Sequence, residues 1–211
     1  MGIVYNPADS TFDVSFNNYT IKTTVTACSS VASNWINDIL RIHSHQNPIV
    51  VGLDIEWCPN GFYGTTGENP AALLQLCVED RCLIFQLIHC DYMPFEFIYF
   101  FSNDRLNFVG VGITSDFKKL EKDYGMKVRS CVNELGDLAA ERTGWELMRK
   151  WSLQKLLLEL REMQLEKPKS ICLSNWSNRL LTPAQIEYAA LDAFASFDLG
   201  WHLIFEDFFC S

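Results

Sequence analysis

Alternating hydrophobic and polar positions predict that the chain begins with β structure. The segments FDVSF and YTIKTTVT alternate on either side of Asn17 and Asn18, a pattern typical of a β-hairpin. A helix is predicted next, from about Ser33 to Ile42. The run PIVVGLDIEW that follows is apolar at most positions, as expected of a buried strand.

The middle of the chain predicts two further strands and then an alternation of helix and strand. ALLQLCV and RCLIFQL are joined by the polar turn Glu79-Asp80, which favours antiparallel neighbours. From Met93 onwards PFEFIYFFSND predicts a helix, NFVGVGIT a strand, SDFKKLEKDYG a helix and KVRSCV a strand, with helices thereafter. This order indicates an α/β fold with a mixed β-sheet flanked by helices and preceded by the hairpin.

The start of the last long helix is clearly marked. Thr182 is a favourable N-cap, Pro183 suits the first helical position, and Gln185 can close a capping box. The helix is expected to run to about Phe205.

The composition is that of a single globular domain. The 211 residues carry a net charge of −9 and are 48% apolar, which excludes a disordered or fibrous chain. No linker or repeat interrupts them. We therefore expect one domain over residues 1–211, with the hairpin and helix in residues 1–47 and the core in residues 48–205.

Neither a membrane span nor a secretion signal is expected. The apolar stretches fall short of 18 residues, and MGIVYNPADS has no basic or strongly apolar region. A soluble intracellular protein of the nucleus or cytoplasm is predicted. The eight cysteines form no CxxC pair, so a zinc site is disfavoured.

Four acidic residues are candidates for a catalytic site. Asp54 and Glu56 lie two apart near the end of the apolar strand, so both carboxylates point to the same face. They are tolerable there if cations lie between them or if the strand ends in a solvated cleft. Two solvent-facing acids at a strand end remain the alternative.

The last helix adds Tyr188 and Asp192, which are four residues apart and share one helix face. Alanines around them would let this helix approach a strand closely. Asp116, at the start of the helix that follows NFVGVGIT, is the fourth acid, with Ser115 as the expected N-cap. An acid in a first helical turn is also explained by the helix dipole alone.

These residues resemble the tyrosine-containing DEDD branch (DEDDy) of the DnaQ-like 3'-5' exonucleases. Asp54-x-Glu56, Asp116 and Tyr188-x-x-x-Asp192 occur in that order, and Glu187 stands where the sister branch has a histidine. VVGLDIEW, AALLQLCVED, GVGITSDFKKL, WSLQKLLLEL, SNWS and LTPAQIEYAALDAF together resemble the Werner-syndrome-type exonuclease domain over roughly residues 48–205.

The resemblance implies an RNase H-like fold and two-metal hydrolysis of a terminal phosphodiester, which releases nucleoside monophosphates. Carboxylates suit two Mg²⁺ or Mn²⁺ ions. Asp54 would bridge both ions, Glu56 and Asp192 would complete the site of one, and Asp116 would hold the other through water. Tyr188 would orient the attacking water. Trp57 is a candidate for packing on the terminal nucleotide, with a structural role as the alternative.

The expected partner is a DNA or RNA strand with a 3' end. The acidic charge argues against nucleic acid, although two Mg²⁺ ions add four charges and bring −9 to −5. The basic clusters at residues 118–129 and 142–155 are local exceptions. Two alternatives stay open, namely a ribonuclease of the RNase D type and a catalytically silent exonuclease fold that binds protein or nucleic acid.

Self-association is a further prediction. PFEFIYFF and the segment WHLIFEDFF carry more apolar residues than one helix face needs, which predicts a homo-oligomer that buries one of them. Burial of the same residues within the monomer is the alternative.

Overall fold

The computed structural model describes residues 2–59 and 67–206. Eight strands form one mixed sheet in the order β1-β2-β3-β6-β5-β4-β7-β8. The strands are β1 (Gly2–Asn6), β2 (Thr11–Phe16), β3 (Tyr19–Thr26), β4 (Ile49–Glu56), β5 (Leu73–Val78), β6 (Arg81–Phe85), β7 (Leu106–Gly110) and β8 (Cys131–Glu134). Within this sheet β3 runs parallel to β6, and β7 runs parallel to both β4 and β8, whereas the other neighbours are antiparallel.

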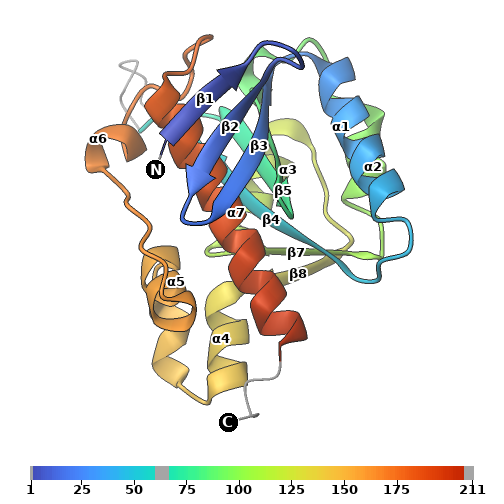
Figure 1. Cartoon of the computed structure of the whole chain (residues 1–211). Coiled ribbons are helices and arrows are strands. Elements are labelled where there is room, and N and C mark those ends of the chain that lie inside the picture. Colours follow the sequence, from blue (N-terminus) through green and yellow to red (C-terminus); the bar gives the residue numbers. More distant parts are fainter. Residues whose placement is uncertain (1, 60–66, 207–211) are drawn as a thin grey trace.

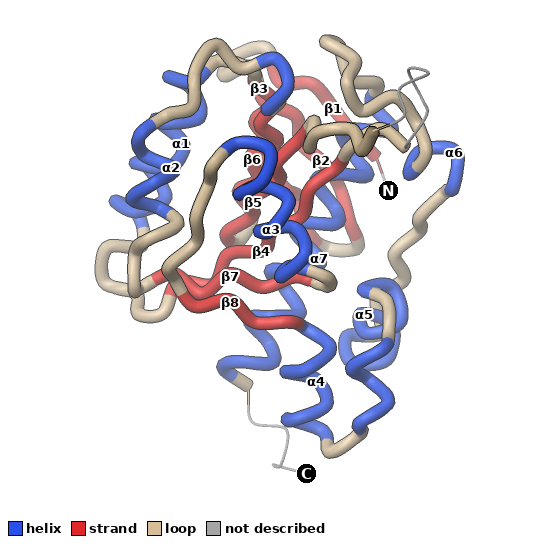
Figure 2. The backbone as a smooth tube through the Cα atoms, turned by 180° about the vertical axis from the view of Figure 1, so that it is seen from behind, coloured by secondary structure: helices blue, strands red, loops and turns tan. Residues whose placement is uncertain are grey.

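Helices cover both faces of the sheet (Figure 1). They are α1 (Ser29–Ile42), α2 (Phe95–Phe100), α3 (Ile113–Tyr124), α4 (Leu135–Thr143), α5 (Leu153–Arg161), α6 (Lys169–Cys172) and α7 (Pro183–Phe205), with short 3-10 turns at Leu87–His89 and Glu146–Lys150. The view from behind places α1, α2 and α3 on one side of the sheet (Figure 2). The long helix α7 crosses the other side, where α4 and α5 pack against it.

The two faces of β4 serve two separate cores. Its odd-numbered residues, such as Leu53 and Ile55, are buried against α1, α2 and α3. Its even-numbered residues face α7, which brings Asp54 and Glu56 beneath that helix. The period of two in a strand therefore decides which residues form the site.

The predicted elements are confirmed with shifted ends. The hairpin on either side of Asn17 is present, but β1 was not predicted and adds a strand at the edge of the sheet. Helix α1 begins at Ser29, four residues before the predicted start, because the Asp91 carboxylate accepts a hydrogen bond from the Ser29 amide at 3.1 Å. A cap that comes from 62 residues away leaves no local signal. The strand predicted in KVRSCV begins only at Cys131.

The glycines after β7 form the turn into α3. Gly112 is the N-cap and has a left-handed backbone with φ of 78°, a region that glycine adopts without strain. Ser115 lies inside the first turn, so the prediction that it caps the helix was wrong. Asp116 keeps its predicted place in that first turn.

The helix predicted in PFEFIYFF is the six-residue helix α2. Phe97 and Phe100 are buried, whereas Phe95 and Tyr99 are each more than 70% exposed. Both faces of α2 are thus apolar, and self-association through its outer face stays a prediction. The second segment predicted to associate, WHLIFEDFF, lies partly in α7, and its residues from 207 onward are outside the described part of the chain.

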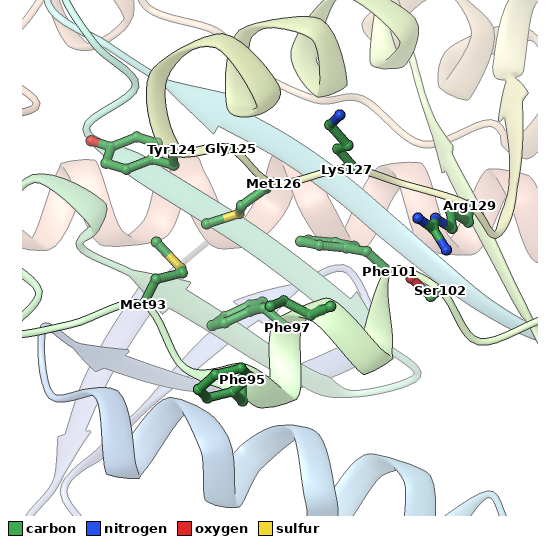
Figure 3. Close-up of a pocket in the computed structure, with 11 residues that line it drawn as sticks. Met93, Phe95, Phe97, Phe101, Ser102, Tyr124, Gly125, Met126, Lys127 and Arg129 are labelled. Carbon is green, nitrogen blue, oxygen red and sulfur yellow. The ribbon is translucent and has the colours of Figure 1, made fainter.

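An apolar pocket of about 380 Å³ lies between α2 and the end of α3 (Figure 3). Met93, Phe97 and Met126 line its interior, and Lys127 and Arg129 lie along one side. None of the predicted site residues lines it. Among the described helices, none has the length and apolar character needed to cross a bilayer.

Candidate metal centre

Three of the predicted carboxylates meet where the end of β4 faces α7. One oxygen from each of Asp54, Glu56 and Asp192 lies within 4.8 Å of the others. Asp192 is 1% exposed, and the other two are partly buried. Two strand residues and one helix residue therefore converge as the sequence predicts.

The close approach of α7 to β4 depends on small residues. A Cβ atom built on Gly52 would lie 2.1 Å from the carbonyl oxygen of Ala193 and 2.5 Å from the amide nitrogen of Phe197. Ala189 and Ala190 are fully buried in the core that also holds Val50 of β4. The alanines around Tyr188 and Asp192 were predicted to permit this approach, and that prediction is confirmed.

Burial and mutual repulsion shift the acids of this cluster toward their protonated forms. Burial first, and then the charge of Asp192, raises the pKa of Asp54 to about 7. Burial and the neighbouring carboxylates also raise the pKa of Glu56, and burial raises the pKa of Asp192. Ionisation of these buried neighbouring acids costs free energy, and a bound divalent cation would offset that cost.

Asp116 lies beside this triad and does not join it. Its side chain is 9% exposed in the first turn of α3, and burial followed by the charge of Asp54 raises its pKa to about 8. The triad oxygens within 4.8 Å of one another do not include an oxygen of Asp116. The role predicted for Asp116, holding the second ion through water, stays a prediction.

Tyr188 lies one turn before Asp192 on α7 and is 9% exposed. The Cys172 thiol donates a hydrogen bond to its hydroxyl at 3.2 Å, and its ring centroid lies 5.7 Å from that of Trp176. Burial and the charge of Asp192 raise the pKa of Tyr188, so its hydroxyl keeps its proton. The tyrosine is held as a neutral hydrogen-bonding group at the edge of the acidic cluster.

The SNWS segment forms the support behind Tyr188. Trp176 is fully buried, and its indole N–H donates to the carbonyl of Cys172 at 3.0 Å. Gln185, whose side chain also closes the predicted capping box with Thr182, donates from its side-chain Nε2 to the carbonyl of Asn175 at 3.0 Å. The motif therefore joins the start of α7 to the segment that contacts Tyr188.

Trp57 directly follows β4 and packs on the side of the sheet that carries Leu53 and Ile55, not on the side of the three carboxylates. It is partly buried against the core formed with α1, α2 and α3, and the Lys119 ammonium lies 5.2 Å from its ring centroid. These contacts are structural. Its role toward a nucleotide stays a prediction.

Lys167 was not singled out from the sequence, although it is the cation at this site. Its Nζ lies 2.7 Å from Oδ2 of Asp192 and 5.5 Å from the ring centroid of Tyr188. Burial disfavours its charge, but Asp192 and Asp54 outweigh that effect, so the pKa of Lys167 is raised. The signal in the sequence was indirect, because cations were one of two ways in which two acids in an apolar strand become tolerable.

Some basic residues of the clusters noted in the sequence form ion pairs with acids in the described part of the chain. Lys119 pairs with Asp123 at 3.1 Å and Lys122 with Glu68 at 2.6 Å. Arg149 pairs with Asp137 at 2.7 Å. These ion pairs reduce the positive charge that the paired residues offer to a nucleic acid.

Known proteins resemble this chain in sequence and in fold. A family model described as a 3'-5' exonuclease matches residues 23–203. A 3'-5' exonuclease of Arabidopsis thaliana is 37% identical over 154 residues, which cover 72% of this chain and 50% of that protein. The bifunctional 3'-5' exonuclease/ATP-dependent helicase WRN of Mus musculus is 40% identical over 147 residues, which cover 69% of this chain and 10% of that protein.

The chain thus spans about half the length of the first relative and a tenth of the second. Among solved structures, RNase D of Escherichia coli superposes with a TM-score of 0.69 at 16% identity, over 89% of this chain and 44% of that one. This is a likeness of fold alone. It confirms the mixed sheet flanked by helices, the RNase H-like class that the sequence predicts.

Proposed function

The chain belongs to the 3'-5' exonuclease family, and from this premise we propose that it hydrolyses the terminal phosphodiester of a DNA or RNA strand with the help of divalent metal ions. The observation that carries the proposal is the convergence of Asp54, Glu56 and Asp192 within 4.8 Å beside Tyr188. A silent fold has no need to keep such a costly cluster of acids.

The donor set fits hard divalent cations. Asp54, Glu56 and Asp192 would hold the ions together with Asp116, and oxygen ligands are those that Mg²⁺ and Mn²⁺ prefer. When bound, such ions supply an activated water and stabilise the leaving oxygen. The three triad acids lie on a strand and a helix that already place their oxygens close together, and a bound cation would favour their charged forms.

The remaining residues orient the reaction. The neutral Tyr188 hydroxyl is able to donate a hydrogen bond to a water or a phosphate oxygen, and its ring is held by Trp176. The contact of Gly52 with Ala193 fixes the distance between the strand and helix that carry the acids. These residues thus support a preorganised site.

A nuclease assay with labelled strands tests the proposal. We would compare 5'-labelled and 3'-labelled DNA and RNA, with Mg²⁺ or Mn²⁺ and with EDTA. Stepwise shortening of 5'-labelled strands and immediate release of a labelled mononucleotide from 3'-labelled strands are expected, in metal only. Preference for RNA would favour the RNase D-like alternative.

The matched variants are Asp54→Asn, at the centre of the cluster, and Asp104→Asn, an exposed aspartate before β7. Asp54→Asn should lose cleavage, and Asp104→Asn should retain it. Cleavage that persists in EDTA or in Asp54→Asn would contradict the proposal. Binding of strands without cleavage in any metal would favour the silent module.

A further inference from the structure

We propose that Lys167 is a tethered counter-ion of the metal-free site, and that a divalent ion binds only when the Lys167 ammonium withdraws from Asp192. The inference rests on the proposed function. It adds a competitor within the chain that sets the metal affinity.

The first argument is the position of the ammonium group. Nζ of Lys167 lies 2.7 Å from Oδ2 of a carboxylate that is 1% exposed. The side chain of Lys167 is itself 23% exposed, so the ion pair lies largely out of solvent. Removal of one partner from such an ion pair destabilises the fold, because it leaves the other charge buried without a partner.

The second argument is that one cation acts on all three acids. Its charge opposes the burial and repulsion that favour protonation of Asp54, Glu56 and Asp192. A divalent ion held by the same three carboxylates would repel an ammonium 2.7 Å from one of their oxygens. The two cations therefore compete for Asp192.

The third argument is that the chain carries Lys167 on an anchored loop between α5 and α6. Before it, the carbonyl of Leu165 accepts a hydrogen bond from the Gln154 side chain at 3.2 Å. After it, the Cys172 thiol donates to the Tyr188 hydroxyl at 3.2 Å. The main chain is thus fixed on both sides, and the flexible methylenes of the lysine are free to move the ammonium away.

The test compares Lys167→Met with Lys169→Met, which removes the same charge from an exposed lysine two residues later. In EDTA at pH 8, Lys167→Met should lower Tm by roughly 5 °C because it leaves the acids uncompensated. Lys169→Met should change Tm by no more than about 1 °C. An unchanged Tm for Lys167→Met would overturn the counter-ion role.

Metal affinity is measured separately, by titration calorimetry with Mn²⁺ and no substrate. Removal of the competitor should tighten Mn²⁺ binding about tenfold in Lys167→Met. A tenfold change in affinity corresponds to one pKa unit of interaction between two charged groups. Lys169→Met should stay within about twofold of the wild type. Weaker or unchanged binding in Lys167→Met would overturn the competition, since it would mean that Lys167 supports the loaded site or has no influence on it.

A double variant shows whether the effect passes through Asp192. In an Asp192→Asn background, Lys167→Met should lower Tm by less than half as much as in the wild type. If the single variant Lys167→Met does not fold, the double variant with Asp192→Asn is still expected to fold. Failure of both variants to fold would overturn the inference. A wild-type chain that binds no Mn²⁺ would contradict the proposed function and the competition, while the Tm values in EDTA would still decide the counter-ion role.

Discussion

Gly52 of β4 lies so close to Ala193 of α7 that a Cβ atom on Gly52 would sit 2.1 Å from the Ala193 carbonyl oxygen. Each of these residues is next to the site in sequence, since Gly52 lies two residues before Asp54 and Ala193 follows Asp192. The contact is between main-chain atoms, so no side chain can rotate to make room. It fixes the separation of the two elements that carry the triad.

Gly52→Ala should therefore destabilise the chain and separate its acids. Overpacking against main chain is expected to cost about 3 kcal/mol or more, and thermal unfolding in EDTA measures the loss. Gly67→Ala is the control, because a Cβ atom there meets nothing within 4 Å. A Gly52→Ala variant with wild-type Tm would show that α7 shifts without cost.

The four acids should differ in their effect on cleavage. Asp54→Ala, Glu56→Ala and Asp192→Ala are each expected to lower the rate by about a thousandfold or more, because each removes a direct ligand. Asp116→Asn should cost roughly 10- to 100-fold, as befits a more distant ligand. Single-turnover rates at saturating Mg²⁺ measure this order. Equal losses for Asp116→Asn and Asp54→Ala would contradict the different positions of the two carboxylates.

The features that local patterns determine were predictable from the sequence. The period of two in β4 placed Asp54 and Glu56 on one face, and the Thr182 capping box placed the start of α7. Together they predicted which side chains would meet. Because Tyr188 and Asp192 are four residues apart in this helix, their position on one helix face was also predictable.

Features that depend on contacts between distant segments were not predictable. The cap that Asp91 provides for α1 joins residues 62 apart, and the start of that helix was predicted too late for this reason. Lys167 lies in a loop, where no periodicity indicates a direction for its side chain. Its pairing with Asp192 depends on how α5 and α6 are placed against α7.

The metal-free protein should lose stability as the pH rises toward neutrality. The pKa of Asp54 is about 7 in the folded chain, above its ordinary value of 3.8. A group with a raised pKa contributes its full stability below about pH 4, and that contribution is lost as the pH rises through the folded pKa of about 7. The site therefore costs stability above neutral pH, on the order of a few kcal/mol.

Asp54→Asn removes this titration. In EDTA, the Tm of Asp54→Asn relative to the wild type should be higher at pH 8 than at pH 5. For Asp104→Asn the difference from the wild type should be the same at both pH values, because that aspartate is exposed. A pH-independent difference for Asp54→Asn would mean that Asp54 has an ordinary pKa in the metal-free fold.

The last prediction concerns Tyr188, whose hydroxyl is proposed to orient the attacking water without holding a metal ion. Tyr188→Phe keeps the ring contact with Trp176 and loses the hydrogen bond from Cys172. One lost hydrogen bond costs about 1 kcal/mol of stability, so Tm should fall by no more than about 4 °C, with Mn²⁺ affinity unchanged. The control is Tyr124→Phe, which removes another hydrogen-bonded hydroxyl at the far end of α3.

The two variants should separate in the chemical step. Loss of one positioned hydrogen bond in a transition state commonly lowers kcat 100- to 1,000-fold, and a metal-activated water depends less on it. We therefore expect Tyr188→Phe to slow single turnover by about 100-fold or less, and Tyr124→Phe to leave it within about twofold. If Tyr188→Phe turns over at the wild-type rate, the tyrosine serves only to pack against Trp176. If its rate falls while strand affinity and Mn²⁺ affinity hold, the hydroxyl acts on the reacting water, because a packing defect would weaken binding as well.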